Sequence, residues 1–233
     1  MLNRFHLDSP LESGAELTLE GDEFHHAVRV HRTKVGDEIE LFDGRGRGVV
    51  GLVRAIDKVS MRVEVARVVL EAREPRVELE IALALIQPDK FEMVLQKATE
   101  LGASSFVPIT SERTEVRPER VAGKEERWRK ILLEAAKQSG RLVIPSLAPP
   151  EPFEVALARP GVNVVLDPAG STSLPDGESL RLFIGPEGGW SEEEFSRAAA
   201  VGAAAWSLGH LRLRAETAAI AGAAIVLRGR GPK

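Results

Sequence analysis

The 233-residue sequence contains no cysteine. This absence excludes disulfide bonds, cysteine-rich zinc sites, iron–sulfur clusters and any reaction that needs a thiolate nucleophile. The chain has room for one large domain or two smaller ones, and it can bury a hydrophobic core without covalent cross-links. Its stability and its chemistry must therefore come from packing and from other side chains.

Tyrosine is also absent, and aromatic residues are few, with eight Phe and three Trp. A base-stacking sheet of the RRM or cold-shock kind uses several exposed aromatic side chains, so we do not expect one here. The chain has no excess of positive charge either, because its formal net charge is −4 and its pI is about 5.8. Non-specific nucleic-acid binders are usually basic. Any contact with RNA would come from local patches.

Long hydrophobic runs are missing as well. No apolar run approaches the roughly 18 residues of a membrane-spanning helix. The first residues, MLNRFHLDSP, lack the apolar segment of a signal peptide. We therefore expect a soluble cytoplasmic protein with no membrane partner.

The N-terminal third has the pattern of a small β-barrel or sandwich. Short apolar runs alternate with turns, and the expected strands are Glu38–Phe42, Val49–Ile56 and Met61–Leu70. One short helix is expected around Asp22–Val30, where histidines and arginines gather. The charged stretch EAREPR, which contains Pro75, indicates a domain boundary. We place the two domains at residues 1–72 and 73–233.

The rest of the chain alternates between strand and helix patterns, which predicts an α/β domain with a mainly parallel sheet. The expected strands are Val77–Ile86, Ser105–Ile109, Val162–Leu166, Arg181–Ile184 and Ala204–Leu208. The expected helices are Lys90–Leu101, Glu125–Ser139, Glu192–Val201 and Glu216–Arg228.

The stretch LFIGPEGGWSEEEF (Leu182–Phe195) passes from an apolar strand through a glycine-rich loop into a helix. Ser191 and Glu194 have the spacing of a capping box, which starts a helix. Strand, glycine loop and helix suggest a nucleotide site. Phosphate, however, favours a positive helix N-terminus, and this loop carries Glu187 and three further glutamates. An adenosine without phosphate, or a ligand with positive charge, would suit it better.

A second strand-to-helix turn, LGHLRLRAETAA (Leu208–Ala219), carries Arg212 and Arg214. Two arginines at such a turn are hard to explain as packing. Ligands of open α/β sheets bind at the carboxyl ends of parallel strands. The turns after Ile184 and Leu208 would lie side by side if their strands were neighbours, and would then form one pocket.

Other features have simpler interpretations. The stretch GRGRG (Gly44–Gly48) is followed by a strand rather than a helix, so we interpret it as a hairpin turn and not as a dinucleotide loop. The histidines of the expected short helix lack metal-ligand spacing, and we expect no metal. Arg29 and Arg32 are consistent with a phosphate-facing patch or with a solvated face.

Two expected helices carry polar side chains, and periodicity alone does not show whether these side chains have a function. On Glu125–Ser139, Glu134 and Gln138 flank an apolar stripe, as in a cleft or on an ordinary surface. On Lys90–Leu101, Lys97 belongs to the side that periodicity places toward solvent.

Four motifs together resemble a known family. IGPEGGWSEEE, LGHLRLRAETA, QKATELG and EAAKQSGR resemble the RsmE family of 16S rRNA uridine-N3 methyltransferases, which belong to the SPOUT class. The N-terminal FHHAVRVHRTKVGDEIELFDGRG resembles that family's PUA-like RNA-binding domain. The resemblance implies a PUA-like β-barrel, a C-terminal SPOUT α/β domain with a deep trefoil knot, bent S-adenosylmethionine as cofactor, and a homodimer acting on 16S rRNA of the small ribosomal subunit.

The resemblance also implies a role for individual residues. Residues expected to bind the cofactor are Leu166, Ile184, Gly185, Pro186, Glu187, Gly188, Gly189, Leu208, Gly209, Leu211, Leu213 and Thr217. Arg214 and Glu216 are expected to be catalytic. Residues expected to contact RNA are Arg4, His26, Arg29, Arg32, Lys97, Gln138, Arg141 and Arg212.

The chain departs from the family within one motif. Where the family has G-x-R-[IV]-L-R-T-E-T, Leu211 takes the place of the first arginine and Arg212 that of the aliphatic residue. The missing cysteine agrees with the implied chemistry, because C5 methylation of pyrimidines commonly uses a cysteine adduct whereas uridine N3 attacks the methyl group directly.

The alternatives to this function are a related SPOUT tRNA methyltransferase acting on a ribose 2′-OH and a non-catalytic RNA-binding or ribosome-assembly module.

Overall fold

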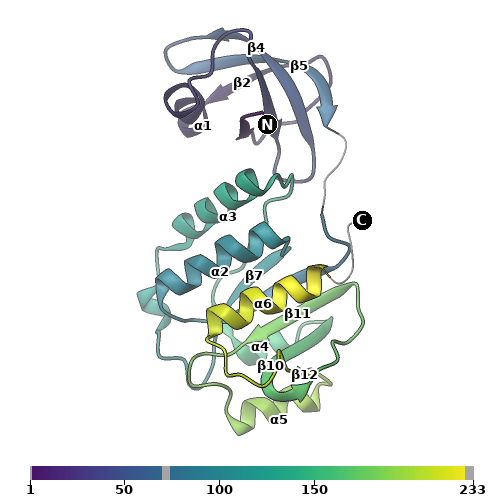
Figure 1. The fold of residues 1–233 in the computed structure, drawn as a ribbon. Helices are drawn as coiled ribbons and strands as arrows, with labels where there is room; N and C mark the ends of the chain where they lie inside the picture. Colours follow the sequence, from purple (N-terminus) through teal and green to yellow (C-terminus); the bar gives the residue numbers. More distant parts are fainter. Residues whose placement is uncertain (1, 70–73, 229–233) are drawn as a thin grey trace. The chain divides into compact units, whose positions relative to one another are not determined.

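The computed structural model describes residues 2–69 and 74–228, which form two compact units (Figure 1). Unit 1 comprises Met1–Arg73 and Ala136–Ile144, and unit 2 comprises Glu74–Ala135 and Pro145–Lys233. The domain boundary expected at residues 72 and 73 lies outside the described residues and stays a prediction. Among the described helices, none combines the length and the apolar character needed to cross a membrane.

Unit 1 is built on a curled five-stranded sheet (Figure 1). Its strands, in spatial order, are β1 (Arg4–His6), β3 (Glu38–Phe42), β4 (Gly48–Ile56), β5 (Ser60–Val69) and β2 (Glu16–Glu20). Strands β1 and β3 are parallel and the other pairs are antiparallel. The three expected strands are confirmed to within a residue or two, except that Leu70 lies outside the described residues. The sequence patterns did not predict β1 and β2, which are short.

Buried and exposed side chains alternate along β2, and the buried ones face the hydrophobic core of unit 1. In β2, Leu17 and Leu19 are buried while the residues between them are exposed, because successive side chains of a strand point to opposite faces. The expected short helix is confirmed as α1 (Gly21–His25), which continues as a π-helical turn, η1 (His26–Val30). Phe24 of α1 packs into the same hydrophobic core.

The stretch Gly44–Gly48 forms the turn of the β3–β4 hairpin, as expected. Asp43 Oδ1 shapes this turn by accepting hydrogen bonds from the backbone N–H groups of Arg45 and Arg47, at 2.8 and 3.0 Å. The segment Ala136–Ile144 also belongs to unit 1, and its last residues pair with the turn. Gly46 N donates to Leu142 O at 3.0 Å, and Ile144 N donates to Gly44 O at 2.9 Å.

Unit 2 contains the expected parallel sheet. Its path of strands is β12 (Ala204–Trp206), β10 (Val162–Ser171), β11 (Ser179–Ile184), β6 (Glu78–Ala84), β7 (Ser105–Thr110) and β8 (Ser146–Leu147), and β9 (Glu151–Pro152) also pairs with β7. All the described pairs in this sheet are parallel. The α/β fold class is therefore confirmed.

Helices cover both faces of this sheet (Figure 1). The helical elements of the unit are α2 (Pro88–Leu101), the 3₁₀ turn η2 (Pro118–Arg120), α3 (Glu125–Ser139, which ends in unit 1), α4 (Phe153–Leu157), α5 (Glu192–Ala200) and α6 (Ala215–Arg228). Helix α6 packs against α2, β6 and β11, whereas α4 packs against β7 and α5. Gly222 lets α6 approach the sheet closely, because a Cβ there would lie 2.8 Å from Leu182 Cδ2.

All four expected helices are confirmed, but α4, β8 and β9 were not predicted because two to five residues carry too little periodicity. Strand β10 continues to Ser171 although its expected end was Leu166. The extension contains Gly170, where a Cβ would lie 2.7 Å from the backbone of Ala205. Glycine therefore permits a close, irregular pairing of β10 with β12.

Candidate active site

A cavity of about 570 Å³ opens at the carboxyl ends of β10, β11 and β12 in unit 2. Both glycine-bearing turns line it, so they form a single pocket as the sequence suggested. Their strands are not neighbours, however, because β10 lies between β11 and β12. The middle of β10 therefore adds Leu166, Asp167 and Pro168 to the lining.

We call the loop Ile184–Trp190 the first wall of this pocket. It closes on itself, because Gly189 N donates to Pro186 O at 2.8 Å and Gly189 has a φ of +71° that favours glycine. The Trp190 indole Nε1–H donates to Leu166 O at 3.2 Å. Its ring lies so close to Gly185 that a Cβ there would be 3.1 Å from it. The first wall is thus held by an internal turn and by the packing of Trp190.

The first wall is continuous with a helix start. Ser191 Oγ accepts from Glu194 N at 3.2 Å, and the Glu194 carboxylate accepts from Ser191 N at 2.9 Å. The expected capping box of α5 is therefore confirmed. It sets the direction in which the chain leaves the pocket.

We call the turn Leu208–Arg214 the second wall. Ser207 Oγ donates to Pro168 O and accepts from Gly209 N, both at 3.2 Å, so this hydroxyl ties the start of the wall to the middle of β10. Gly209 has a φ of +123°, which glycine tolerates best. Beyond it the side chains are exposed, and Leu211 is 81% exposed. The second wall thus presents side chains, whereas the first presents backbone.

Most of the residues that the sequence analysis assigned to the cofactor line the cavity. The exception is Thr217, which is exposed on α6 and is not among the lining residues. Arg214 lines the cavity at the end of the second wall, and so does Arg212, which was assigned to RNA. Glu216 is buried in the first turn of α6 and does not line it.

Sequence reasoning missed several lining residues: Arg113, Asp167, Pro168, Trp190, Trp206, His210, Ala215 and Ala218. Most of them are close in sequence to the predicted residues, so including the residues that flank each motif would have found them. Arg113 is different, since it follows β7, far from both motifs in sequence. Nothing local in its surroundings pointed to the pocket.

The charges of the lining are mixed. Arg113, Arg212 and Arg214 contribute guanidinium groups, while Asp167 and Glu187 contribute carboxylates. Asp167 Oδ1 also accepts a hydrogen bond from Ala169 N at 2.7 Å. This cavity can accommodate a ligand with a cationic centre, and its arginines can stabilise negative charge that develops on a reacting group.

The arginines of unit 1 that were assigned to RNA differ in their surroundings. Arg4 forms an ion pair with Glu40 and donates from Nη1 to Arg141 O at 3.2 Å. Arg141 itself is buried. Arg29 and Arg32 are exposed on and just after η1.

The other residues assigned to RNA are spread over both units. In unit 1, His26 is half-buried and Gln138 is exposed. Lys97 belongs to unit 2, where its ammonium lies 2.9 Å from a Glu100 carboxylate oxygen.

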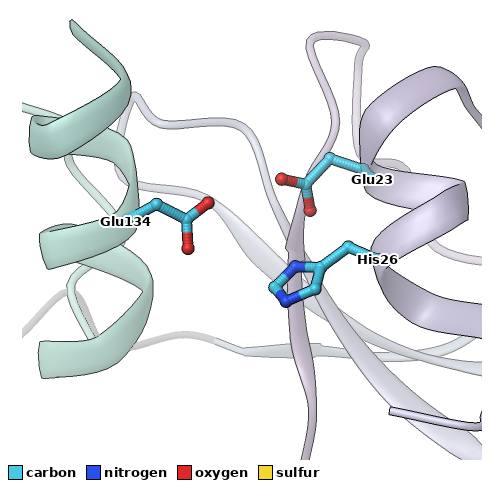
Figure 2. A group of neighbouring side chains, drawn as sticks. All are labelled: Glu23, His26 and Glu134. Atoms are coloured by element: carbon cyan, nitrogen blue, oxygen red, sulfur yellow. The ribbon is translucent and has the colours of Figure 1, made fainter. Parts of the chain in front are cut away.

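Glu23 and His26 project from α1 and η1, and Figure 2 draws them together with Glu134 of α3. Glu134 belongs to unit 2. Within unit 1, Lys137 Nζ lies 2.8 Å from Glu23 Oε1 and 3.3 Å from His26 Nδ1. An ammonium group thus already supplies the positive charge beside these two side chains. We therefore do not assign a metal to them.

Two family models match the chain. A model of an RNA methyltransferase domain matches residues 73–227, and a model of an RNA methyltransferase PUA domain matches residues 19–65. The two matches follow the same order along the chain as the two structural units.

Curated proteins and solved structures agree with the family models. The ribosomal RNA small subunit methyltransferase E of Bacillus subtilis (strain 168) is 32% identical over 225 residues, which cover 89% of this chain and 88% of that protein. The enzyme of the same name from Synechocystis is 35% identical over 88% of this chain and 70% of its own length.

Among solved structures, the methyltransferase E of Neisseria gonorrhoeae bound to S-adenosylmethionine has a TM-score of 0.92 and 28% identity, over 99% of both chains. The Legionella pneumophila protein Lpg2936, in complex with the same cofactor, has a TM-score of 0.90 and 31% identity, over 100% of this chain and 99% of its own. The chain therefore belongs to the RNA methyltransferase family whose curated members are named ribosomal RNA small subunit methyltransferase E, the RsmE family that its motifs indicate.

Proposed function

We propose that the chain is an S-adenosylmethionine-dependent methyltransferase that modifies N3 of a uridine in 16S rRNA of the small ribosomal subunit. The observation that carries this proposal is the cavity at the carboxyl ends of β10, β11 and β12, formed by the two motifs that first indicated the family. Relatives of nearly the same length and fold hold S-adenosylmethionine.

The residues present fit this cofactor. Leu166, Ile184 and Leu208 offer an apolar surface for an adenine ring, and the neighbouring loops offer backbone N–H and C=O groups. Three arginines also line the cavity, but Glu187 and Asp167 supply carboxylates that can attract a cationic sulfonium. S-adenosylmethionine has the sulfonium and lacks the phosphate. The donor that it supplies is a methyl group bound to sulfur.

The second wall suits the acceptor. Uridine N3 lies on the Watson–Crick edge, so the base must be unpaired or flipped out to reach the cavity. When N3 loses its proton, negative charge spreads to the O2 and O4 carbonyls, and N3 then forms its bond to carbon as the sulfur–carbon bond breaks. Arg214 is exposed and lines the cavity, and we assign to its guanidinium the stabilisation of that charge. Among the lining groups, His210, Asp167 and Glu187 can accept the proton.

Glu216 has a different role in this proposal. It is buried two residues after Arg214, in the first turn of α6. A carboxylate in the first turn interacts favourably with the helix dipole. We therefore assign Glu216 to holding the end of the second wall and not to contact with the substrate.

RNA affinity is assigned mainly to unit 1. Arg29 and Arg32 are exposed cationic side chains, and Gln138 is an exposed polar one. Arg4 and Arg141 are engaged within unit 1, so their contact with RNA stays a prediction. Contacts from arginine to phosphate make binding depend steeply on salt.

Three further features belong to the proposal. A trefoil knot is consistent with a strand order in which β12 lies beyond β10 while the following α6 packs back against β6. A homodimer would cover Leu211 and Leu213, which are exposed apolar side chains on the second wall. A cytoplasmic location follows from the ribosomal RNA that the relatives are named for.

Methylation mapping tests the proposed function. Small subunits and free 16S rRNA from cells that lack this modification are incubated with the full-length protein and S-adenosylmethionine, and the nucleosides are then identified by mass spectrometry. We expect one 3-methyluridine, formed about 10²–10³ times more slowly by the Arg214→Ala protein. A methyl group on a ribose 2′-OH, or no transfer by a protein that binds the cofactor, would contradict the assignment.

A further inference from the structure

The loop Ser111–Thr114, which follows β7, reaches the first wall although it belongs to neither motif. Arg113 Nη1 donates to Gly188 O at 3.1 Å, and Glu112 N donates to Glu194 Oε1 at 2.9 Å. Arg113 also lines the cavity. One loop from a distant part of the sequence thus contacts both the middle of the first wall and the helix that follows it.

Glu194 is the residue that joins these parts. It is 3% exposed, and both of its carboxylate oxygens are used: Oε2 accepts from Ser191 N at 2.9 Å, and Oε1 accepts from Glu112 N. A capping box needs only the contact to Ser191. The second oxygen satisfies a backbone N–H of another loop. Without it, that partly buried donor would lose its partner, at a cost in free energy.

The Ser111–Thr114 loop is fixed internally, so holding it at one point holds all of it. Ser111 N donates to Thr114 Oγ1 at 2.9 Å, and Thr114 N donates to Ser111 O at 3.1 Å. The stem of Arg113 packs so closely on Gly188 that a Cβ at residue 188 would lie 3.1 Å from Arg113 Cβ. The absence of a side chain at Gly188 therefore favours this close packing of the loop, in addition to the cofactor contact that the resemblance implies for Gly188.

We propose that Glu194 is a positioning residue of the cofactor pocket, which anchors the Ser111–Thr114 loop and thereby keeps Arg113 on Gly188 as part of the pocket lining. The proposal rests on the proposed function in one respect, namely that this cavity binds S-adenosylmethionine. Arg113 and Glu194 then act together: the first contacts the wall, and the second holds the loop that carries it.

The test compares three alanine variants of the full-length protein. Glu194→Ala removes the bridge and one half of the capping box. Ser191→Ala removes the other half of the capping box and leaves the bridge. Glu193→Ala is the control: it removes a carboxylate from the same helical turn, and the Glu193 side chain is 80% exposed. Only the first variant should release the loop.

Two measurements separate positioning from helix capping. Without ligand, the Glu112 amide should exchange its hydrogen faster in Glu194→Ala and at the wild-type rate in Ser191→Ala and Glu193→Ala. By calorimetry, the Kd for S-adenosylmethionine should rise about 10-fold or more in Glu194→Ala. It should stay within about 2-fold of wild type in the other two variants.

A double variant and an isosteric variant complete the design. Arg113→Ala, like Glu194→Ala, should raise the Kd for S-adenosylmethionine. The double variant should have a Kd close to that of either single variant, because both substitutions break the same connection between the loop and the first wall. If Glu194→Ala does not fold, Glu194→Gln retains one acceptor oxygen and should give a smaller change in the same direction. Unchanged exchange at Glu112, or equal Kd values in Glu194→Ala and Ser191→Ala, would overturn the inference. A wild-type protein that fails to bind the cofactor would instead contradict the proposed function.

Discussion

The two walls of the pocket are built in opposite ways. The first wall, Ile184–Trp190, is held by an internal turn, by the Trp190 indole and by Arg113, and it offers mostly backbone to a ligand. The second wall, Leu208–Arg214, is held near its start by Ser207 and at its end where Arg214 O accepts from Ala218 N at 2.8 Å, and between these points it exposes its side chains. A rigid backbone surface suits a cofactor that is the same in every turnover. Exposed arginines suit an RNA substrate and the charge that develops during methyl transfer.

The largest effect is expected at the end of the second wall. Arg214→Ala removes a preorganised guanidinium from the reacting base, which typically costs about 10²–10³ in rate. The Kd for S-adenosylmethionine should stay close to wild type, because the first wall is untouched. Single-turnover methylation with both substrates saturating measures this directly. A rate within a few-fold of wild type would remove Arg214 from the reaction.

A smaller but still large effect is expected in the first wall. Gly189→Ala places a methyl group on the pocket lining and forces alanine into a φ of +71°, and we expect the Kd for S-adenosylmethionine to rise about 10-fold, or about 1.4 kcal/mol.

Gly202→Ala is the matched control for that variant. Gly202 has a φ of +78° with nothing within 4 Å of an added Cβ, as at Gly189, but it does not line the cavity. Both variants should lose about 1 kcal/mol of stability from the left-handed backbone. Equal Kd values in the two proteins would mean that Gly189 does not face the cofactor.

The smallest effect is expected at Arg212, in the middle of the second wall. Arg212→Ala should weaken RNA binding and reduce the slope of log K against log salt by about 1, as for one lost phosphate contact. The single-turnover rate at saturation should stay near wild type. Filter binding of 16S rRNA at several salt concentrations gives the slope. A loss of rate as large as that of Arg214→Ala would place Arg212 in the chemistry as well.

Local patterns were sufficient to predict much of this molecule. The capping box of Ser191 and Glu194, the hairpin turn at Gly44–Gly48 and the four long helices depend on residues close in sequence, and all were predicted. The pocket itself was predicted because two glycine turns follow apolar strands at a sheet's carboxyl edge.

The rest depends on contacts between distant residues. Arg113 meets Gly188 across 75 positions of the sequence, and Arg4 meets Arg141 across 137. Periodicity in the sequence cannot predict contacts between such distant residues. The sequence also does not show whether an arginine side chain forms hydrogen bonds or ion pairs within the protein. Strand order is equally non-local, so that β10 between β11 and β12 appeared only in the structure. The second role of Glu194 was hidden for the same reason.

The position of the bound cofactor tests the central claim most directly. The full-length protein is crystallised with S-adenosylhomocysteine, the product that remains after methyl transfer. The account predicts electron density for the ligand between the first wall and the second, against Gly189 on one side and Leu208 on the other, with the sulfur facing Arg214. Density in any other part of the protein, or a cavity without ligand at saturating concentration, would contradict it.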